Sequence, residues 1–322
     1  MKTKIVYVLV SSPNDYYLEQ TWLSIFSLKR IQRDAFISLV VDDKTFNSLT
    51  GYRRKILDLV DELKNVFFED EVSNMRRSRL LKTGLRNTID GDFLYVDGDT
   101  VITESLEEID NFPYSIGAVQ ACHIPFSDYY AKNELNRLFK HLNFQTSTYF
   151  NGGVIYVKDN EDGRLLFSNW HKYYLDNMDE IRADMPSLTK ANAELNLIRE
   201  LDGIWNCQIL YGMKYLQKAK IIHYFASNFM ESKSDHPYLF MDISVFKTIK
   251  KQGAITENII NMIDNARSLW ETKIEVIGGQ ELNIYHSRLM KILRWLYYGH
   301  HNTYLKIERL LESAARRKNK NK

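Results

Sequence analysis

Two aspartates separated by a single glycine follow a short apolar run. The run extends from Phe93 to Val96, and the carboxylates belong to Asp97 and Asp99. Four consecutive apolar residues predict a buried strand. Ligands of open α/β sheets bind beyond the carboxyl ends of the strands, and paired carboxylates there suit a hard divalent cation. The alternative is a solvated turn, because Asp-Gly is a frequent pair in hairpin turns.

His223 offers a third group that could bind the same cation. It lies in the apolar run 220–225, which predicts another strand. A lone histidine in such a run is most often a hydrogen-bonded core residue, and this interpretation stays open. Beside two carboxylates, an imidazole nitrogen is a suitable additional ligand for a divalent metal.

Three cations precede the aspartates at helical spacing. Arg79, Lys82 and Arg86 fall at i, i+3 and i+7 in a helix predicted over residues 76–89, so they share one face. A solvated charged face is one interpretation. A phosphate-bearing ligand is the other, because such a ligand needs cations beside the metal that binds its oxygens.

An asparagine and two glycines stand before a later apolar run. Asn151, Gly152 and Gly153 precede the predicted strand 154–157. Glycines allow the backbone to approach a ligand closely, and the Asn151 amide would then face that ligand. A β-bulge or a tight turn would explain the same residues without any ligand.

The elements around these groups alternate between strand and helix. Over the first hundred residues the sequence predicts strands at 4–10, 36–41, 66–68 and 93–96, and helices at 16–30, 56–63 and 76–89. This alternation is typical of an α/β fold with a parallel sheet covered by helices. No G-x-G-x-x-G follows the first strand and no G-x-x-x-x-G-K-[ST] occurs. These absences argue against a dinucleotide-binding Rossmann fold and a P-loop NTPase.

Length and composition are those of a globular protein. The chain has 322 residues, of which 44% are hydrophobic and 26% charged, enough for one large domain or two smaller ones. Two cysteines, Cys122 and Cys207, cannot form a disulfide framework or a zinc cluster, so a reducing compartment is expected. The first residues lack a secretory signal, and no apolar run approaches the roughly 20 residues of a membrane-spanning helix. We therefore expect a cytoplasmic protein.

The net charge of +2 hides a strongly basic C-terminus. Residues 286–322 contain ten Lys and Arg against two Glu, a net of +8, and subtracting this from +2 leaves −6 for the rest of the chain. The periodicity is helical from about residue 242 onward, and the last helix mixes Leu293, Trp295 and Leu296 with basic residues. Such a helix predicts peripheral contact with an anionic membrane, and a helical cap docked on the domain is the alternative. No contact with nucleic acid is expected.

Taken in chain order, these features resemble the retaining glycosyltransferases of family 8, which include bacterial lipooligosaccharide galactosyl- and glucosyltransferases. The resemblance covers residues 4–240. Five elements carry it: the first strand with its Ser11-Ser12 turn, Arg79, residues 94–100, residues 150–154, which match F-N-[SG]-G-V, and His223. The order of the five, rather than any one of them, makes the resemblance specific.

The resemblance implies a GT-A fold, with a mixed, mostly parallel twisted sheet flanked by helices over residues 1–240. A helical C-terminal extension with a basic tail would follow over 241–322. The implied reaction moves a hexose from UDP-glucose or UDP-galactose, with retention of configuration, to a glycan or glycolipid acceptor of a cell-surface polysaccharide or lipopolysaccharide. It would take place in the cytoplasm at the inner face of the membrane. Asp97, Asp99 and His223 would hold Mn²⁺ or Mg²⁺ on the UDP pyrophosphate.

The resemblance also implies which residues bind the donor substrate. Ser11 and Asp42 lie where the family contacts uridine. Arg79 and Lys82 would stabilise the charge of the leaving UDP, and Asn151 would touch the donor sugar.

The chain departs from the family at two motifs. Where the family has D-Q-D-x-L-N, residues 191–196 read Ala-Asn-Ala-Glu-Leu-Asn, so both motif carboxylates are missing. Asn192 or Glu194 is predicted to take over the catalytic role at the donor sugar. The alternatives are a different donor sugar, weak activity, or a degenerate GT-A domain that binds nucleotide or glycan without turnover. The family's last motif is reduced to His223, and either Lys233 or the later His236-Pro237-Tyr238 is the candidate for its missing part.

Overall fold

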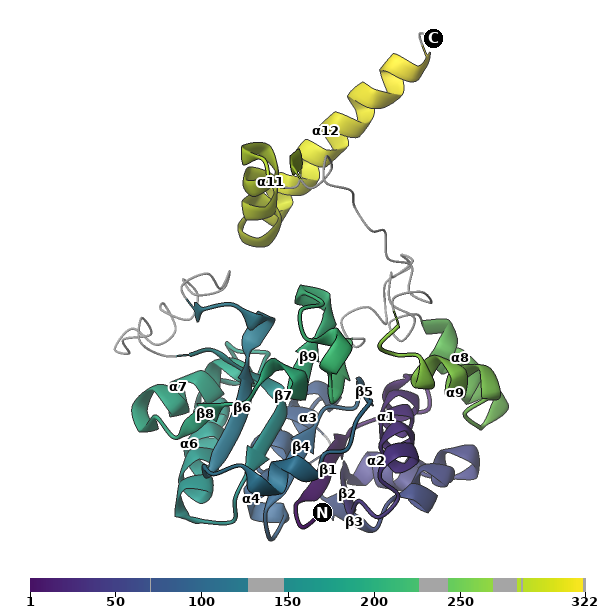
Figure 1. Ribbon diagram of the computed structural model, residues 1–322, viewed down its shortest axis with the longest axis vertical. Helices are drawn as coiled ribbons and strands as arrows, with labels where there is room; N and C mark the ends of the chain where they lie inside the picture. Colours follow the sequence, from purple (N-terminus) through teal and green to yellow (C-terminus); the bar gives the residue numbers. More distant parts are fainter. Residues whose placement is uncertain (70, 127–147, 226–242, 269–282, 285, 321–322) are drawn as a thin grey trace.

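Seven strands form the central sheet of the computed structural model, which describes residues 1–322 apart from 70, 127–147, 226–242, 269–282, 285 and 321–322. Neighbouring strands follow the order β3-β2-β1-β4-β7-β6-β8 (Figure 1). Their bounds are Lys4–Leu9 (β1), Ile37–Asp42 (β2), Glu62–Val66 (β3), Phe93–Val96 (β4), Ile116–Gln120 (β6), Phe150–Val157 (β7) and Ile198–Glu200 (β8). Among these seven strands, β7 alone runs antiparallel to its neighbours. The prediction of a mixed, mostly parallel sheet is confirmed.

A smaller sheet of three strands continues from the end of β4. It consists of β5 (Thr100–Ile102), β9 (Cys207–Gln208) and β10 (Ile221–His223), with β10 antiparallel to β5 and parallel to β9. β4 and β5 therefore belong to different sheets. The segment that holds Asp97 and Asp99 joins two sheets, so its interpretation as a solvated hairpin turn is wrong.

Helices cover both faces of the central sheet (Figure 1). Their bounds are Tyr17–Ile31 (α1), Asp43–Ser48 (α2), Asn74–Thr83 (α3), Leu85–Thr88 (α4), Glu161–Asn177 (α6), Met185–Leu195 (α7), Ile243–Gln252 (α8), Glu257–Asp264 (α9), Arg288–Gly299 (α11) and His301–Lys320 (α12). Short 3-10 helices are Gly51–Leu59 (η1), Glu107–Asn111 (η2), Ala121–His123 (η3), Gly203–Asn206 (η6), Ile209–Tyr211 (η7) and Leu216–Lys218 (η8).

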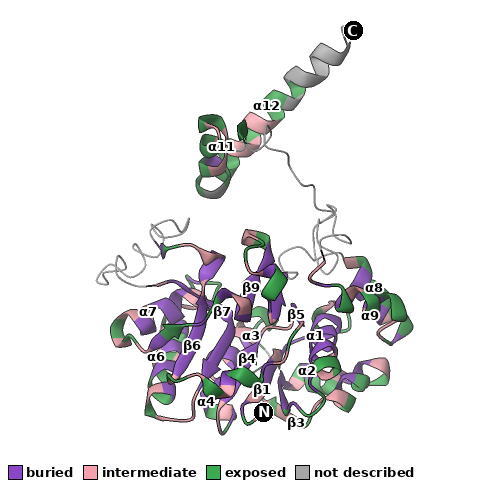
Figure 2. Ribbon diagram, in the orientation of Figure 1, coloured by how far each residue is buried: buried purple, intermediate pink, exposed green. Residues whose placement is uncertain are grey.

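The side chains of β1 alternate between two hydrophobic clusters. Ile5, Tyr7 and Leu9 pack in the cluster that contains the apolar residues of α1. Val6, and Val10 just after the strand, pack in the cluster that contains the apolar residues of α3, α4, α6 and α7. Both faces of the inner strands are therefore buried, as the colouring of Figure 2 shows. Burial on both faces explains why these strands read as continuous apolar runs instead of alternating with polar residues.

Some local predictions were wrong. The strand predicted over 66–68 lies instead at Glu62–Val66 (β3). The helix predicted over 56–63 is the 3-10 helix η1 followed by the edge strand β3. The sequence of β3, Glu-Leu-Lys-Asn-Val, is only partly buried and so lacks the apolar run that reveals an inner strand. Gly152 and Gly153 lie inside β7 and not in a turn before it.

The C-terminal helices form two groups. Val245, Phe246 and Ile249 of α8 belong to the same hydrophobic cluster as α1, and α9 adds further side chains to it. Helices α11 and α12 pack against each other and are drawn apart from the sheet in Figure 1. Within the described ranges, no helix has both the length and the apolar character needed to cross a membrane. The boundary at residue 240 stays a prediction, although α8 shows that residues beyond it contribute to the core.

Candidate functional site

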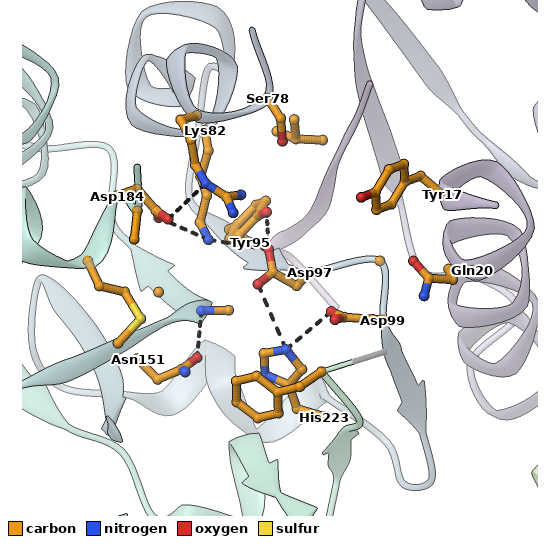
Figure 3. A pocket seen from close by; sticks show the side chains of 18 of the residues that line it. Tyr17, Gln20, Ser78, Lys82, Tyr95, Asp97, Asp99, Asn151, Asp184 and His223 are labelled. Carbon is orange, nitrogen blue, oxygen red and sulfur yellow. Dashed lines mark hydrogen bonds and ion pairs between the residues drawn. The ribbon is translucent and has the colours of Figure 1, made fainter. Parts of the chain in front are cut away.

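A cavity lies where several strand ends meet. The carboxyl ends of β1, β4 and β6 point to the same edge of the sheet as the amino end of β7, because β7 runs the opposite way. The cavity has a volume of about 670 Å³, which is typical of sites for small molecules. Its walls include α1, α3 and the segment between β4 and β5 (Figure 3).

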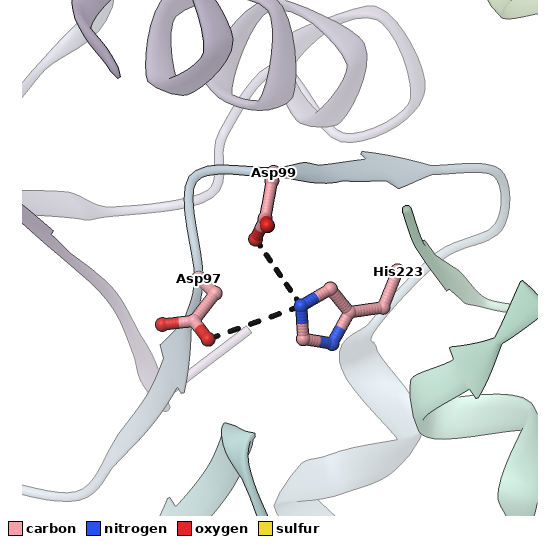
Figure 4. A group of neighbouring side chains, drawn as sticks. All are labelled: Asp97, Asp99 and His223. Atoms are coloured by element: carbon pink, nitrogen blue, oxygen red, sulfur yellow. Dashed lines mark ion pairs between the residues drawn. The ribbon is translucent and has the colours of Figure 1, made fainter. Parts of the chain in front are cut away.

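Asp97, Asp99 and His223 meet in this cavity (Figure 4). One ligand atom from each lies within 4.8 Å of the other two. The distance from His223 Nε2 is 3.1 Å to Asp99 Oδ1 and 3.9 Å to Asp97 Oδ2. Two carboxylate oxygens and one imidazole nitrogen are a donor set that Mg²⁺ or Mn²⁺ accepts, so the three residues could hold such an ion.

The two sheets together position these three side chains. The Asp97 N–H donates to the Gly153 carbonyl oxygen at 2.7 Å, which ties the end of β4 to β7. The Tyr224 N–H donates to the Asp99 carbonyl oxygen at 3.0 Å, and His223 pairs with Thr100 across β10 and β5. The central sheet therefore places Asp97, and the small sheet places Asp99 and His223.

Position 98 needs a glycine because a side chain would not fit there, and not because of the backbone conformation. A Cβ at Gly98 would lie 2.3 Å from Thr21 Oγ1 and 3.2 Å from Thr21 Cβ, both on helix α1. Its φ is not among the positive values that glycine alone tolerates easily. Helix α1 therefore approaches the segment between the two aspartates too closely for any larger residue.

Asp184 also lines the cavity, although no sequence pattern singled it out. Lys82 Nζ lies 3.1 Å from Asp184 Oδ2 and 3.3 Å from Asp97 Oδ1, so one buried cation bridges two carboxylates. Arg79 Nε lies 3.3 Å from Asp184 Oδ1. Asp184 immediately precedes α7, whose first turn contains Pro186. An aspartate before a helix start marked by proline was the sequence signal that could have drawn attention to it.

The neighbouring charges control the ionisation of Asp184. Burial alone would raise the pKa of Asp184, but the cations of Lys82 and Arg79 outweigh burial and hold this pKa below its ordinary value. The Tyr95 hydroxyl donates to Asp97 Oδ1. Burial, followed by the charge of Asp97, raises the pKa of Tyr95 well above its ordinary value. Near pH 7, Asp184 is therefore a carboxylate and Tyr95 a neutral hydrogen-bond donor.

The stability that Asp184 contributes should depend on pH. Its folded-state pKa lies below that of the unfolded chain, which is about 3.9. The contribution is therefore complete above roughly pH 5 and is lost as the pH falls through the depressed pKa. From urea titrations, we expect the difference in free energy of unfolding between wild type and Asp184→Asn to be constant above about pH 5 and to shrink below about pH 4. A difference that stayed constant down to about pH 3 would contradict this ionisation state.

The charged lining residues carry an excess of negative charge. Three carboxylates, those of Asp97, Asp99 and Asp184, face the two cations of Arg79 and Lys82. With a neutral imidazole, the described lining residues have a net charge of minus one. A bound divalent cation would change this to plus one, so the cavity suits an anionic ligand such as a pyrophosphate only together with the metal.

The structure does not place Ser11 or Asp42 in the cavity lining. Ser11 is 4% exposed; its hydroxyl donates to Asp15 and accepts from Arg53. Asp42 is fully buried, caps helix α2 and pairs with Arg77 at 3.0 Å. Their polar side-chain atoms are engaged in holding loops, so a contact with uridine by these side chains is not supported.

The predicted catalytic residues also lie outside the lining. Asn192 Oδ1 accepts hydrogen bonds from the N–H groups of Leu197 and Ile198, just after the end of α7. Glu194 is exposed and accepts a hydrogen bond from the Tyr173 hydroxyl. Their placement does not support a catalytic role, because the residues that line the pocket at the start of α7 are Asp184 and Met185 and do not include Asn192 or Glu194.

The three cations predicted to share a face separate in the structure. Arg79 and Lys82 line the cavity, whereas Arg86 donates to backbone oxygens of Ile89 and Gly91. Helix α3 ends at Thr83 and Arg86 belongs to α4, so the interruption turns it away from the site. The two candidates for the last family motif, Lys233 and residues 236–238, lie outside the described residues.

Comparison with known proteins identifies the fold. No protein-family model matches the sequence, and no curated protein matches it. Among solved structures, the galactosyltransferase LgtC in complex with donor and acceptor sugar analogues aligns with a TM-score of 0.51 at 13% identity, over 80% of this chain and 99% of that one. The bifunctional glycosyltransferase WbbM aligns at 0.52 and 14% identity, over 81% of this chain and 51% of that one. Mouse xyloside xylosyltransferase 1 aligns at 0.47 and 14% identity, over 70% and 98%.

At such low identities the likeness concerns the fold alone. The mixed sheet, with a single antiparallel strand and helices on both faces, corresponds to the architecture of LgtC. The chain therefore has a GT-A fold, as the sequence predicted.

Proposed function

We propose that this chain is a divalent-cation-dependent, retaining glycosyltransferase that moves a hexose from UDP-glucose or UDP-galactose to a glycan or glycolipid acceptor. The observation that carries the proposal is the meeting of Asp97, Asp99 and His223 in a cavity that also contains Arg79 and Lys82. The likeness of fold to LgtC, which was solved with donor and acceptor sugar analogues, supports this class of substrate. The acceptor proposed is a cell-surface polysaccharide or lipopolysaccharide.

In this proposal Asp97, Asp99 and His223 hold Mn²⁺ or Mg²⁺. When bound, the cation would supply electrophilic stabilisation of the charge that develops on the diphosphate of the departing UDP. Arg79 can add to this stabilisation, because its side chain lies at the cavity wall and is 34% exposed, so that its charge can reach a bound anion. Lys82 lines the cavity but is almost fully buried between two carboxylates, so we assign it the role of orienting Asp97.

We assign Asn151 and Asp184 to the part of the site that binds the donor sugar. Asn151 Oδ1 already accepts from the Gly153 N–H and from Asn206 Nδ2, so the amide nitrogen of Asn151 is the group left for a sugar hydroxyl. Asp184 lines the cavity, is 4% exposed and pairs with Lys82 through Oδ2. It is the lining carboxylate that lies outside the group of Asp97, Asp99 and His223, and we assign it the role of the missing motif carboxylates.

A donor screen tests the proposal. The full-length protein is incubated with a panel of UDP- and GDP-sugars and Mn²⁺, and nucleotide release is measured with and without an acceptor mixture. We expect release of UDP from UDP-glucose or UDP-galactose and little from GDP-sugars. Calorimetry that shows UDP binding, without turnover of any donor, would instead favour a GT-A domain that binds without catalysis. Turnover that is unaffected by EDTA would contradict the metal role.

We also infer that α11 and α12 contact an anionic membrane, which would keep the protein at the cytoplasmic face. Leu289, Ile292 and Trp295 expose 65%, 53% and 61% of their surface, and their spacing places them along one side of α11. Arg288 and Lys291 are exposed and adjacent to them in sequence. An exposed apolar stripe beside basic side chains is the arrangement that binds at the boundary of an anionic bilayer.

Removing the apolar stripe should strongly weaken vesicle binding. The triple variant Leu289→Ser, Ile292→Ser and Trp295→Ser is expected to lose at least about tenfold in partition onto vesicles that contain phosphatidylserine, since each buried large side chain contributes roughly 1.5 kcal/mol or more. A matched control is Leu165→Ser with Leu175→Ser, which removes leucines of α6 that are 44% and 43% exposed. Equal binding by wild type and triple variant in co-sedimentation would rule out this surface.

A further inference from the structure

A row of buried amides lies next to His223 on the side opposite the carboxylates. His223 Nδ1 is 3.0 Å from Asn206 Oδ1, and Asn206 Nδ2 is 2.9 Å from Asn151 Oδ1. The Gly153 N–H donates to the same Asn151 oxygen at 2.7 Å. The exposed fractions of Asn206, His223 and Asn151 are 0%, 2% and 3%, so these hydrogen bonds are shielded from bulk water.

One backbone group determines the direction of every hydrogen bond in this row. A backbone N–H can only donate, so the Asn151 atom that faces Gly153 must be its oxygen. The Asn206 atom that faces the same oxygen must then be the amide nitrogen, which leaves the Asn206 oxygen against His223 Nδ1. An amide oxygen can only accept, and the ring nitrogen Nδ1 therefore carries a proton.

The other ring nitrogen then faces the carboxylates with its lone pair. A neutral imidazole with its proton on Nδ1 has none on Nε2. Nε2 lies 3.1 Å from Asp99 Oδ1, and a lone pair at this distance from a carboxylate oxygen is repelled. The repulsion is relieved when a cation, a metal ion or a second proton, binds to Nε2. The row of amides thus prepares His223 to act as a metal ligand.

Packing holds the imidazole ring in this orientation. The Phe225 ring stacks on it with a centroid distance of 4.0 Å and an interplanar angle of 7°. A Cβ at Gly153 would lie 2.4 Å from His223 Cε1, so only glycine leaves room for the ring. Phe225 has a φ of 54°, a strained value for a residue with a bulky side chain. Strain of this kind concentrates at functional sites, where the surrounding structure maintains it.

We propose that Asn206 is a positioning residue of the metal site: its oxygen keeps the His223 proton on Nδ1 and so presents the Nε2 lone pair to a divalent cation bound by Asp97 and Asp99. Metal-binding histidines commonly donate their other N–H to a polar group, which fixes the tautomer and the ring orientation. Here Asn151 and Gly153 in turn fix the Asn206 amide. The inference rests on the proposed divalent-cation site.

The tautomer can be measured in the full-length wild-type protein. Long-range ¹H–¹⁵N correlation spectra of protein labelled with ¹⁵N-histidine distinguish a protonated ring nitrogen from one that bears a lone pair. The His223 signals are identified by their loss in His223→Gln. We expect a proton on Nδ1 both before and after addition of Mg²⁺, which is diamagnetic. A neutral ring with its proton on Nε2 would overturn the proposal.

Two substitutions of Asn206 separate positioning from general stability. Asn206→Leu removes the acceptor for Nδ1–H and is expected to weaken binding of Mn²⁺ alone by about 10- to 100-fold in titrations followed by electron paramagnetic resonance. Asn206→Asp keeps an acceptor toward Nδ1 but places a second acceptor against Asn151, so its thermal stability should fall while its Mn²⁺ affinity stays closer to that of the wild type. Equal Mn²⁺ affinity in wild type and Asn206→Leu would overturn the proposal.

Gln32→Leu is the control for loss of a buried amide, and the donor screen is the independent assay. Gln32→Leu also removes a buried amide acceptor, for the Leu106 N–H, but lies outside the cavity lining, so it should lower stability without changing Mn²⁺ affinity. Failure of the proposed function would appear differently: the donor screen would show no turnover in wild type, while the tautomer and the Mn²⁺ affinities would still follow Asn206. Turnover in the donor screen together with the wrong tautomer would reject the role of Asn206 alone.

Discussion

Asp97→Ala and Asp99→Ala are each expected to lower kcat/KM for sugar transfer by about 10³-fold or more. Each substitution removes a carboxylate from the proposed metal site. A cation bound there is expected to contribute several kcal/mol of charge stabilisation in the transition state. Since about 1.4 kcal/mol corresponds to tenfold in rate, a loss of about 4 kcal/mol gives this factor. Nucleotide release from the best donor of the screen is the measurement, and EDTA should reduce wild-type activity to a similar level until Mn²⁺ is restored.

The folded state of these variants needs an independent control. Lys82 keeps its ion pair with Asp184 when Asp97 is lost, so the thermal unfolding of Asp97→Ala should remain cooperative. Asp179→Ala removes an exposed carboxylate that pairs with Arg76 outside the cavity lining and should leave kcat/KM unchanged. Activity of Asp97→Ala within about threefold of the wild type would reject the metal role of Asp97, because a lost ligand costs far more than that.

Lys82→Met is expected to lower the free energy of unfolding by about 3–5 kcal/mol. The Lys82 side chain is 4% exposed and the Asp184 side chain 6%, so the substitution leaves a buried carboxylate without its nearest counter-charge. Denaturant titrations measure the change. Arg79 lies 3.3 Å from the other Asp184 oxygen and compensates for part of the loss, which places the expected value toward the lower end of this range.

A double-mutant cycle isolates the pair itself. In Lys82→Met with Asp184→Leu both buried charges are removed, and the loss of stability should be smaller than the sum of the two single losses. The exposed pair of Lys172 and Asp176, at 66% and 52% side-chain exposure, is the matched control and should couple by less than about 1 kcal/mol. Additive losses at Lys82 and Asp184 would show that the contact is not a stabilising ion pair.

Much of the fold could be predicted because it depends on short-range patterns. The strand Phe93–Val96 was predicted with its observed bounds, and β1, β2 and α1 were predicted within one or two residues of theirs. These inner strands are buried on both faces, so their apolar runs are long and unambiguous. The edge strand β3 was predicted at 66–68 instead of Glu62–Val66, because partial exposure at the sheet edge allows Glu, Lys and Asn among its residues.

The sequence by itself determined that two carboxylates stand at the end of a buried strand in an α/β fold. Tertiary structure decided what surrounds them. The small sheet brings His223 against Asp99, and the start of α7 brings Asp184 against Lys82, while Asn192 and Glu194 are carried away from the cavity. The direction of the amide row beside His223 is likewise set by contacts between β7, η6 and β10. Periodicity records which faces are buried, but which strand ends meet depends on contacts between segments far apart in the chain, and no local pattern encodes those contacts.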